Sequence, residues 1–470
     1  MSTLRRLPFA ISRQGEGSLQ SRIHNDIRQA IQAGRLAPGA RLPSTRSLAS
    51  ELGVARGTVD AVYARLTGEG YIVGRGSAGT IVSPTVVMRR SAPPVSPPSG
   101  SLITAAMPIR FHIGLPSLDL FPYTRWARLV SQHARKLSPI GPHHPNPAGL
   151  PALREAIVGY LAVARGFACH PAQVFITAGY QGALDLATRL VLREKDSVWF
   201  EDPGYSFARD ALAAKPVRVV PVPVDGEGLR VDDGIALAPQ ARLAIVTPSH
   251  QSPLTVTMSQ ARRQLLLDWA EGAGSWVVED DYDSEFHYAG FRPAALKSID
   301  AADRVFFAGS FSKTLLPSLR LGFLVVPETF IAAAGEEATA MHRGEAAFMQ
   351  QVVATFIAEG HFSRHLRRMR ARYDARRRAL ATALTSAFGD TVEIRNQGGG
   401  LHLIAQFHGH GADIDIMARA RASGLWVSAL SAQSTVHPAG DALMLGFANI
   451  PEQEAAKHVA ALKRAIASHP

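Results

Sequence analysis

The sequence predicts an α/β body with a largely parallel sheet, preceded by a small, basic helical head. After Pro108, short apolar runs alternate with amphipathic helical patterns, and no run is long enough to span a membrane. The head differs in charge: residues 1–90 hold 13 Arg, no Lys and 5 acidic residues, a net charge of +8. The other 380 residues carry only +3. A basic head on a nearly neutral body is typical of a protein that meets a polyanion.

The composition is that of an ordered protein, with 46% hydrophobic and 19% charged residues in a chain of 470. The single cysteine, Cys169, cannot form an internal disulfide, which is typical of a reducing compartment. The first residues include Arg5 and Arg6 but no apolar stretch that would make a secretory signal. We therefore expect a cytoplasmic protein that makes no membrane contact.

Apolar spacing in the head predicts three helices and a hairpin. The first helix spans 18–36, the second starts after Ser44 as its N-cap and stops at Gly53, and the third covers about 55–69. Two short extended segments then flank the glycine-rich turn 74–79. This order of helix, helix–turn–helix and hairpin predicts a winged helix.

The starts of the second and third helices carry residues that suit DNA reading. Arg suits guanine edges in the major groove, whereas Thr and backbone N–H groups suit phosphates. The alternative is a three-helix packing module with exposed arginines. The runs 42–49, 52–59 and 69–71 closely resemble the GntR-type winged helix, and the resemblance covers about residues 16–83.

On that resemblance we expect seven DNA-contacting residues, the last two of them in the wing: Ser44, Arg46, Arg56, Gly57, Thr58, Arg75 and Gly76. The family often has Ser or Thr where this chain has Gly57, so one side-chain contact is expected to be missing. Behind the head, residues 84–108 hold six prolines interleaved with Ser and Ala. We expect an extended linker there, at ~3.1 Å per residue in polyproline geometry.

The body shows short apolar runs that predict strands, separated by helical patterns: 174–177, 197–201, 243–247, 276–279, 305–308 and 321–326. The motif Gly-Ser-Phe-Ser-Lys-Thr at 309–314 follows one of them, and Arg320 comes seven residues after Lys313. A pyridoxal cofactor needs an amine for a Schiff base, phosphate donors, an acid for its ring nitrogen and an aromatic face. Lys313 supplies the amine, and Ser310, Ser312 and Arg320 can bind phosphate beside it.

Other predicted strand ends supply the remaining groups. Gly179, Tyr180 and Gln181 open a helix whose N-terminal N–H groups can face the same phosphate. Asp280 could pair with the ring nitrogen, and Tyr282 could donate to the ring hydroxyl.

Tyr205 ends a further predicted strand, and its ring could stack on the cofactor. Taken singly these signals are weak, since a lone Ser-x-x-Lys is usually a surface lysine and an acidic run is usually solvated. Four of the features, however, stand at the C-terminal ends of predicted strands. That edge is where open α/β sheets bind ligands.

The body resembles the fold-type I aminotransferases over about residues 110–465, and three runs narrow the match: 201–205, 279–286 and 315–322. With the GntR-type head in front, the chain is similar to members of the MocR family of regulators. The resemblance implies an α/β fold-type I PLP-dependent aminotransferase-like domain over 109–465, with a smaller subdomain from about 335. An N-terminal winged helix-turn-helix domain precedes it.

The same resemblance implies roles for the candidate residues. Pyridoxal 5′-phosphate would be bound on Lys313, with Asp280 at the ring nitrogen, Tyr282 near the ring oxygen and Tyr205 stacked on the ring. Ser310, Ser312 and Arg320 would lie at the phosphate. It also implies a head-to-tail homodimer whose winged helices pack near the partner's large domain.

Three departures from the enzyme pattern argue against efficient transamination and against an α-carboxylate substrate. Met444 stands where enzymes have an Arg that holds the carboxylate, and His144 stands where many have Tyr. The segment 249–255 lacks the glycine often found after its proline. Elsewhere, the spacing of His408 and His410 suits no common zinc site, so no metal is expected. The arginine-rich helix over 364–378 is expected to be a solvated face, with added DNA contact as the alternative.

Our hypothesis is a ligand-responsive transcription regulator bound to operator DNA. A small amine or amino-acid effector would displace Lys313 from the cofactor, form an external aldimine and so alter DNA binding. A variant of the hypothesis has pyridoxal phosphate itself as the sensed molecule. The first rival is an active aminotransferase that carries a DNA-binding module. The second is a dimerisation scaffold without cofactor.

Overall fold

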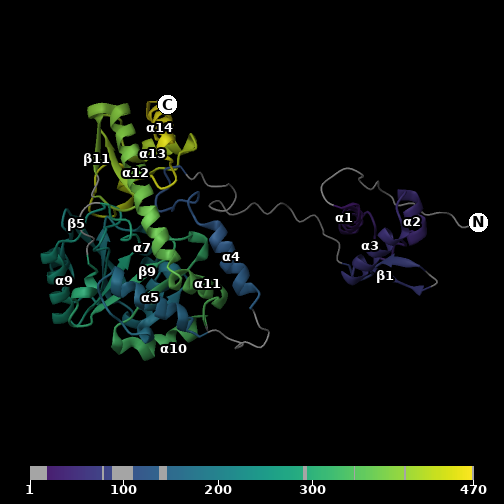
Figure 1. Cartoon of the computed structure of the whole chain (residues 1–470), viewed down its shortest axis with the longest axis horizontal. Helices are drawn as coiled ribbons and strands as arrows, with labels where there is room; N and C mark the ends of the chain where they lie inside the picture. Colours follow the sequence, from purple (N-terminus) through teal and green to yellow (C-terminus); the bar gives the residue numbers. More distant parts are fainter. Residues whose placement is uncertain are drawn as a thin grey trace, which may run out of the picture. The chain divides into compact units, whose positions relative to one another are not determined.

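The computed structural model describes residues 18–76, 79–86, 110–136, 146–288, 294–342, 344–395 and 398–467. The chain divides into two compact units, Met1–Ala105 and Ala106–Pro470, each of which is described by itself (Figure 1). Of the expected linker over 84–108, only residues 84–86 lie within the described residues.

The first unit has the element order predicted for a winged helix. Its elements follow one another as α1 (Leu19–Gln32), α2 (Thr45–Leu52), α3 (Arg56–Gly68), β1 (Ile72–Gly74) and β2 (Thr80–Val82). The Ser44 side chain accepts a hydrogen bond from the Ser47 N–H at 3.1 Å, which caps α2 as predicted. α2 ends at Gly53, whose φ of 63° is costly for other residues. Apolar residues of the three helices and two strands form one core.

The second unit is built on an eight-stranded sheet in the order β3-β10-β9-β8-β7-β4-β5-β6. Its strands are β3 (Val174–Thr177), β4 (Ser197–Asp202), β5 (Arg218–Asp225), β6 (Gly228–Leu229), β7 (Leu243–Val246), β8 (Trp276–Asp281), β9 (Val305–Ser310) and β10 (Gly322–Val325). β4, β5, β7, β8 and β9 pair in parallel, so the expectation of a largely parallel sheet is confirmed. β10 runs antiparallel to both of its neighbours, because the connection 311–321 is too short for a parallel crossover.

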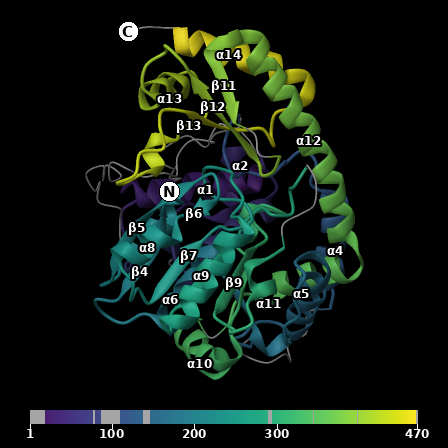
Figure 2. The same cartoon turned by 90° about the vertical axis from the view of Figure 1, so that its left-hand side faces the viewer.

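Helices cover both faces of this sheet, as Figure 2 shows. Successive strand residues face opposite layers. Val278 packs in one layer with α6 (Gly179–Val191), α7 (Ser206–Ala213) and α10 (Ile331–His342). Val277 packs in the other layer, whose helices are α4 (Tyr123–Ala134), α5 (Pro151–Ala164), α8 (Val231–Leu237), α9 (Gln260–Gly272) and α11 (Ala347–Ala358). Because the central strands are buried on both faces, they read in the sequence as continuous apolar runs.

A smaller antiparallel sheet, in the order β11-β12-β14-β13, lies at one end of the body. Its elements are α12 (His361–Phe388), β11 (Val392–Arg395), β12 (His402–Phe407), α13 (Asp413–Ala422), β13 (Ser428–Ala429), β14 (Leu443–Gly446) and α14 (Ala455–Ala467). We expected this subdomain to begin near residue 335. In the structure the apolar faces of α10 and α11 pack on α6 and α5, which are helices of the large sheet. α10 and α11 therefore belong with the large sheet. The first helix of the smaller subdomain is the long α12, which runs from the large-sheet part of the body to the small-sheet part (Figure 1).

The basic run of α12 is only partly the solvated face that we expected. Arg376 is 3% exposed, and its guanidinium donates to Ser117 Oγ at 2.7 Å and pairs with Asp119 at 2.6 Å. The expectation was wrong for Arg376, because helical spacing turns it inward between the buried Tyr373 and Leu380.

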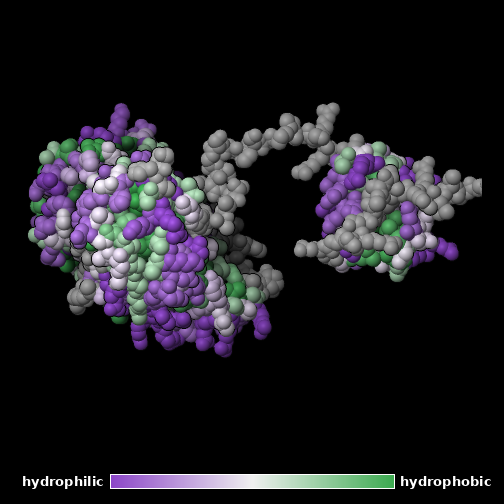
Figure 3. Space-filling view, turned by 90° about the horizontal axis from the view of Figure 1, so that it is seen from above, coloured by the Kyte–Doolittle hydropathy of each residue, from purple (hydrophilic) through white to green (hydrophobic). Residues whose placement is uncertain are grey.

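Most of the molecular face in Figure 3 is hydrophilic, with small hydrophobic patches. None of the helices in the described part of the chain is long and apolar enough to cross a membrane. Across the same residues, no cluster of three or more His, Cys, Asp or Glu is arranged to hold a metal ion.

Candidate cofactor site and DNA-reading face

The predicted site residues of the body meet at one edge of the large sheet. β3, β4, β8 and β9 all run the same way, and their C-terminal ends bring Gly179, Tyr205, Asp280 and Ser310 to that edge. β10 runs the opposite way, so its N-terminal end delivers Arg320 to the same place. The reversal that the sequence did not predict therefore helps to build the site.

Lys313 is half-buried among these residues and contacts a segment from far away in the chain. Its Nζ donates a hydrogen bond to the carbonyl of Gly114 at 2.7 Å. Burial lowers the pKa of the Lys313 amine, and the carboxylates of Asp283 and Asp280 oppose that shift. A lowered pKa increases the fraction of neutral amine, which is the nucleophilic form.

Asp280 is a buried carboxylate held beside two tyrosines. Burial raises the pKa of Asp280 well above its usual range, and a hydrogen bond from the Tyr180 hydroxyl opposes the shift. The rings of Tyr180 and Tyr205 lie 6.2 Å apart at 55°. Burial also raises the pKa of Tyr205, followed by the charge of Asp280, whereas the charge of Arg320 lowers it. Tyr205, Asp280 and Arg320 therefore share one electrostatic environment, as a single ligand would require.

The start of α6 forms a backbone surface that could bind an anion. No side chain among the described residues caps its first N–H groups, and Gln181 in the first turn is exposed. β10 passes this helix end so closely that a Cβ on Gly322 would lie 2.8 Å from the carbonyl carbon of Gly179. Ser310 Oγ accepts a hydrogen bond from the Ser312 N–H at 3.2 Å. Free helix N–H groups beside serine hydroxyls and an arginine match the needs of a phosphate.

Gly114 lies in the segment that precedes α4, and contacts with distant residues hold this segment in place. The sequence did not predict these contacts. Asn449 donates hydrogen bonds to the carbonyls of Leu115 and Pro116 at 3.0 and 2.9 Å. The Tyr373 hydroxyl accepts from the Ser117 N–H at 2.8 Å, next to the ion pair of Arg376. These contacts join α12 and the segment after β14 to the residues just after Gly114, and no local sequence signal could have revealed them.

A second missed feature is a buried ion-pair network below β8. Arg165 has a fully buried side chain whose Nε lies 2.7 Å from Asp281 Oδ2. The same guanidinium donates to Ser249 Oγ at 2.7 Å and lies 3.8 Å from Glu279. Because Glu279 and Asp281 flank Asp280 along the strand, Arg165 supports the strand end that presents Asp280 and Tyr282.

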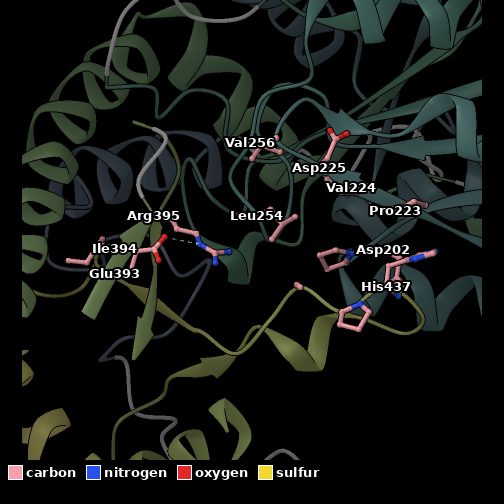
Figure 4. A pocket seen from close by; sticks show the side chains of 14 residues that line it. Asp202, Pro223, Val224, Asp225, Leu254, Val256, Glu393, Ile394, Arg395 and His437 are labelled. Atoms are coloured by element: carbon pink, nitrogen blue, oxygen red, sulfur yellow. Dashed lines mark hydrogen bonds and ion pairs between the residues drawn. The ribbon is translucent and has the colours of Figure 1, made fainter. Parts of the chain in front are cut away.

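A cleft of about 710 Å³ separates the large sheet's edge from the smaller sheet (Figure 4). The large sheet contributes Asp202 and Asp225, and the segment after β7 contributes Leu254. The smaller sheet contributes Arg395, which pairs with Glu393 at 3.6 Å. Its lining does not include Lys313, Asp280 or Tyr205, so it is distinct from the predicted cofactor site. Its walls belong to both parts of the body, so a change in their relative position would change its volume.

Two of the three departures from the enzyme pattern can be placed in the structure. Met444 is buried in an apolar cluster with Ile404 and Leu430, which offers no partner for a carboxylate. Thr255 stands two residues after Pro253 and has a φ of 62°, a conformation that normally requires glycine. The backbone there keeps a glycine-like shape without the glycine. His144 lies outside the described residues.

The head presents the predicted DNA residues at the starts of α2 and α3. Arg46, Arg56 and Gly57 are exposed, and nothing lies within 4 Å of the position that a Cβ on Gly57 would take. Arg56 pairs with Asp60 at 3.4 Å on the same helix, and Thr58 lies in the first turn of α3. Ser44 Oγ is engaged in capping α2.

Arg75 and Gly76 follow β1 in the wing, where the Arg75 N–H donates to the Gly79 carbonyl at 2.8 Å. Gly76 has a φ of 55°. The helix starts and the wing thus both expose basic side chains, and the DNA-contact roles of the seven residues stay predictions.

Comparison with known proteins agrees with this two-part arrangement. Residues 19–82 match the bacterial regulatory proteins of the gntR family, and residues 128–440 match aminotransferase class I and II. The probable rhizopine catabolism regulatory protein MocR of Rhizobium meliloti is 35% identical over 97% of this chain and 96% of its own. The transcriptional regulator TauR of Rhodobacter capsulatus is 33% identical over 89% of this chain and 90% of its own.

Among solved structures, kynurenine aminotransferase of Pyrococcus horikoshii in complex with PMP superposes on the body with a TM-score of 0.69. The two are 25% identical, and the match covers 77% of this chain and 91% of that one. The chain is thus a DNA-binding head of the gntR family joined to a body with the fold of PLP-dependent class I and II aminotransferases. More narrowly, it belongs to the MocR family of transcription regulators. The predicted fold class and family are confirmed.

Proposed function

We propose that this regulator binds pyridoxal phosphate through Lys313. The observation that carries the proposal is the meeting of a half-buried amine of lowered pKa, a buried carboxylate and a free helix N-terminus at one sheet edge. Asp280 would pair with the ring nitrogen, because a cationic partner offsets the cost of burying its charge. Ser310, Ser312, Arg320 and the start of α6 would hold the phosphate. When bound, the cofactor supplies a carbon on which one amine can replace another.

We infer that a small primary amine is the effector and that it competes with Lys313 for that carbon. Met444 and its apolar neighbours leave the expected carboxylate position without a charged partner, so an amine that lacks an α-carboxylate fits better than an α-amino acid. An α-carboxylate placed beside Met444 would have no ionic partner in apolar surroundings, and this would weaken the binding of an α-amino acid.

We infer further that the state of Lys313 reaches the head through the segment that contains Gly114. The Gly114 carbonyl accepts from Lys313, and the same segment follows the linker residues in the chain. An effector that engages or releases Lys313 therefore alters a contact of the residues leading to the winged helix. Two heads in a homodimer would then change their fit to paired half-sites.

DNA binding by the full chain tests this function. DNA selected from a random library by the protein serves as the operator, and its affinity is measured by fluorescence anisotropy. With pyridoxal phosphate present, we expect a primary amine to shift the affinity more than the α-amino acid of the same side chain. The response should require the cofactor and should be lost in Lys313→Ala. An affinity that no amine changes, with or without cofactor, would refute effector control through this site.

The helix start in the head can be tested with a matched pair of arginines. Arg56 and Arg65 are both exposed on α3 and each pairs with an acid four residues later, but they lie at opposite ends of the helix. We expect Arg56→Ala to weaken binding to the selected DNA by about 1–3 kcal/mol, as for a lost base contact. Arg65→Ala should change binding little. Equal effects of the two variants would contradict the assigned orientation of α3.

A further inference from the structure

One ring nitrogen in the cofactor site has two hydrogen-bonding partners. His250 Nδ1 lies 2.9 Å from Asp283 Oδ1 and 3.0 Å from the Tyr282 hydroxyl. The His250 side chain is 7% exposed and that of Asp283 is 1% exposed. The cluster therefore joins the segment after β7 to the segment after β8.

The surroundings of His250 determine which of its nitrogens carries the proton. Nε2 is buried, and none of the described residues offers it a hydrogen-bond partner. A proton on Nε2 would leave a buried donor unsatisfied and would turn the Nδ1 lone pair toward the Asp283 carboxylate, and both are costly. A proton on Nδ1 avoids both costs. Asp283 thus selects the tautomer in which Nδ1 is a donor.

We propose that Asp283 and His250 are positioning residues that make Tyr282 a hydrogen-bond donor toward the ring oxygen of the bound cofactor. The Nδ1–H reaches both Asp283 and the Tyr282 oxygen. Because the Tyr282 oxygen accepts this hydrogen bond, its own hydroxyl hydrogen is left for the ligand. This inference rests on the cofactor site proposed above and adds two residues to it.

Residues at the start of the smaller sheet pack against the cluster. A Cβ on Gly400 would lie 2.1 Å from His250 Cε1, so only glycine fits at this close approach. His402 on β12 lies 6.4 Å from His250, ring centre to ring centre, and donates to the Pro253 carbonyl at 3.1 Å. Burial lowers the pKa of His402 to about 4, so it stays neutral near pH 7. The other titratable groups around the cluster are Glu201, Asp280, Tyr288 and Lys313.

A pH titration of the visible band of the pyridoxal-phosphate-loaded full chain tests the proposal. A donor to the ring oxygen stabilises its negative charge and lets the neighbouring nitrogen lose its proton at lower pH. Removing that donor should raise the pH at the midpoint of the titration. We expect Tyr282→Phe and His250→Leu each to raise it by about one pH unit. His250→Leu should add nothing in the Tyr282→Phe background, because both changes remove the same hydrogen bond.

A conservative variant separates positioning from packing. His250→Asn keeps an N–H at the Nδ1 position and should stay near the wild-type midpoint, whereas His250→Gln, whose amide lies farther out, should behave like His250→Leu. If circular dichroism shows His250→Leu to be unfolded, the Gln and Asn pair carries the same test. A wild-type band with midpoints unchanged in both His250→Leu and His250→Gln would overturn this inference alone. Equal shifts with and without Tyr282 would also overturn it. A wild-type protein without any visible band would instead overturn the cofactor site.

Discussion

Gly114→Ala should abolish or strongly weaken cofactor binding. Gly114 has a φ of 69°, and a Cβ there would lie 2.3 Å from Lys313 Nζ. The added methyl group therefore occupies the space of the reactive amine, in a backbone conformation that itself costs about 1–2 kcal/mol for a residue with a Cβ. We expect an affinity for pyridoxal phosphate at least about tenfold lower, which corresponds to 1.4 kcal/mol. Titration of the apoprotein, followed by visible absorbance, measures it.

Gly274→Ala is the matched control for that experiment. Gly274 has a similar φ of 62°, but nothing lies within 4 Å of the position that its Cβ would take. This variant carries the conformational cost without the contact with Lys313, so its cofactor affinity should be near the wild-type value. If Gly114→Ala binds the cofactor as tightly as Gly274→Ala, the Lys313–Gly114 contact has no part in the site.

Arg165→Met should lower the stability of the body by about 3–5 kcal/mol, because it leaves the buried Asp281 without its ionic partner. Urea unfolding followed by tryptophan fluorescence measures the change, since Trp199 and Trp269 stack in the core of this unit. Adding Asp281→Asn should restore part of the loss, because the uncompensated charge is then removed as well.

An exposed ion pair provides the comparison for Arg165. Arg189 lies 2.9 Å from Asp185 with about half of its side chain exposed. Arg189→Met should cost only about 0–1 kcal/mol, as exposed pairs do. A loss below about 1 kcal/mol for Arg165→Met would mean that the buried network is not a significant support of β8.

The head could be predicted nearly element by element because its signals are local. Ser44 caps the helix that it precedes, and Gly53 ends the same helix with a positive φ. Six strands of the large sheet were also predictable, because burial on both faces makes each of them one continuous apolar run. The partly exposed β5 (Arg218–Asp225) has no such run and was not predicted. The motif residues at the strand ends then converge for a topological reason, since parallel strands deliver their C-terminal ends to one edge.

The parts of the site that could not be predicted depend on contacts between distant segments. Lys313 and Gly114 are 199 residues apart in the chain, and no local sequence pattern indicates that they are in contact. Arg376 looked like one more solvated arginine because seven others surround it in the helix, and only the packed structure reveals its inward turn. His250 gave no signal either, since its role depends on Asp283 and Tyr282 from another strand end.

The most direct test of cofactor binding through Lys313 is the visible absorption spectrum of the purified full chain mixed with pyridoxal phosphate. The same spectrum of the Lys313→Ala variant is the comparison. We predict an absorption band of the lysine-bound cofactor in the wild-type protein and no such band in the variant. A band of equal strength in both would place the cofactor on another amine. No band in either protein would contradict the cofactor site and leave a DNA-binding regulator whose body senses something else.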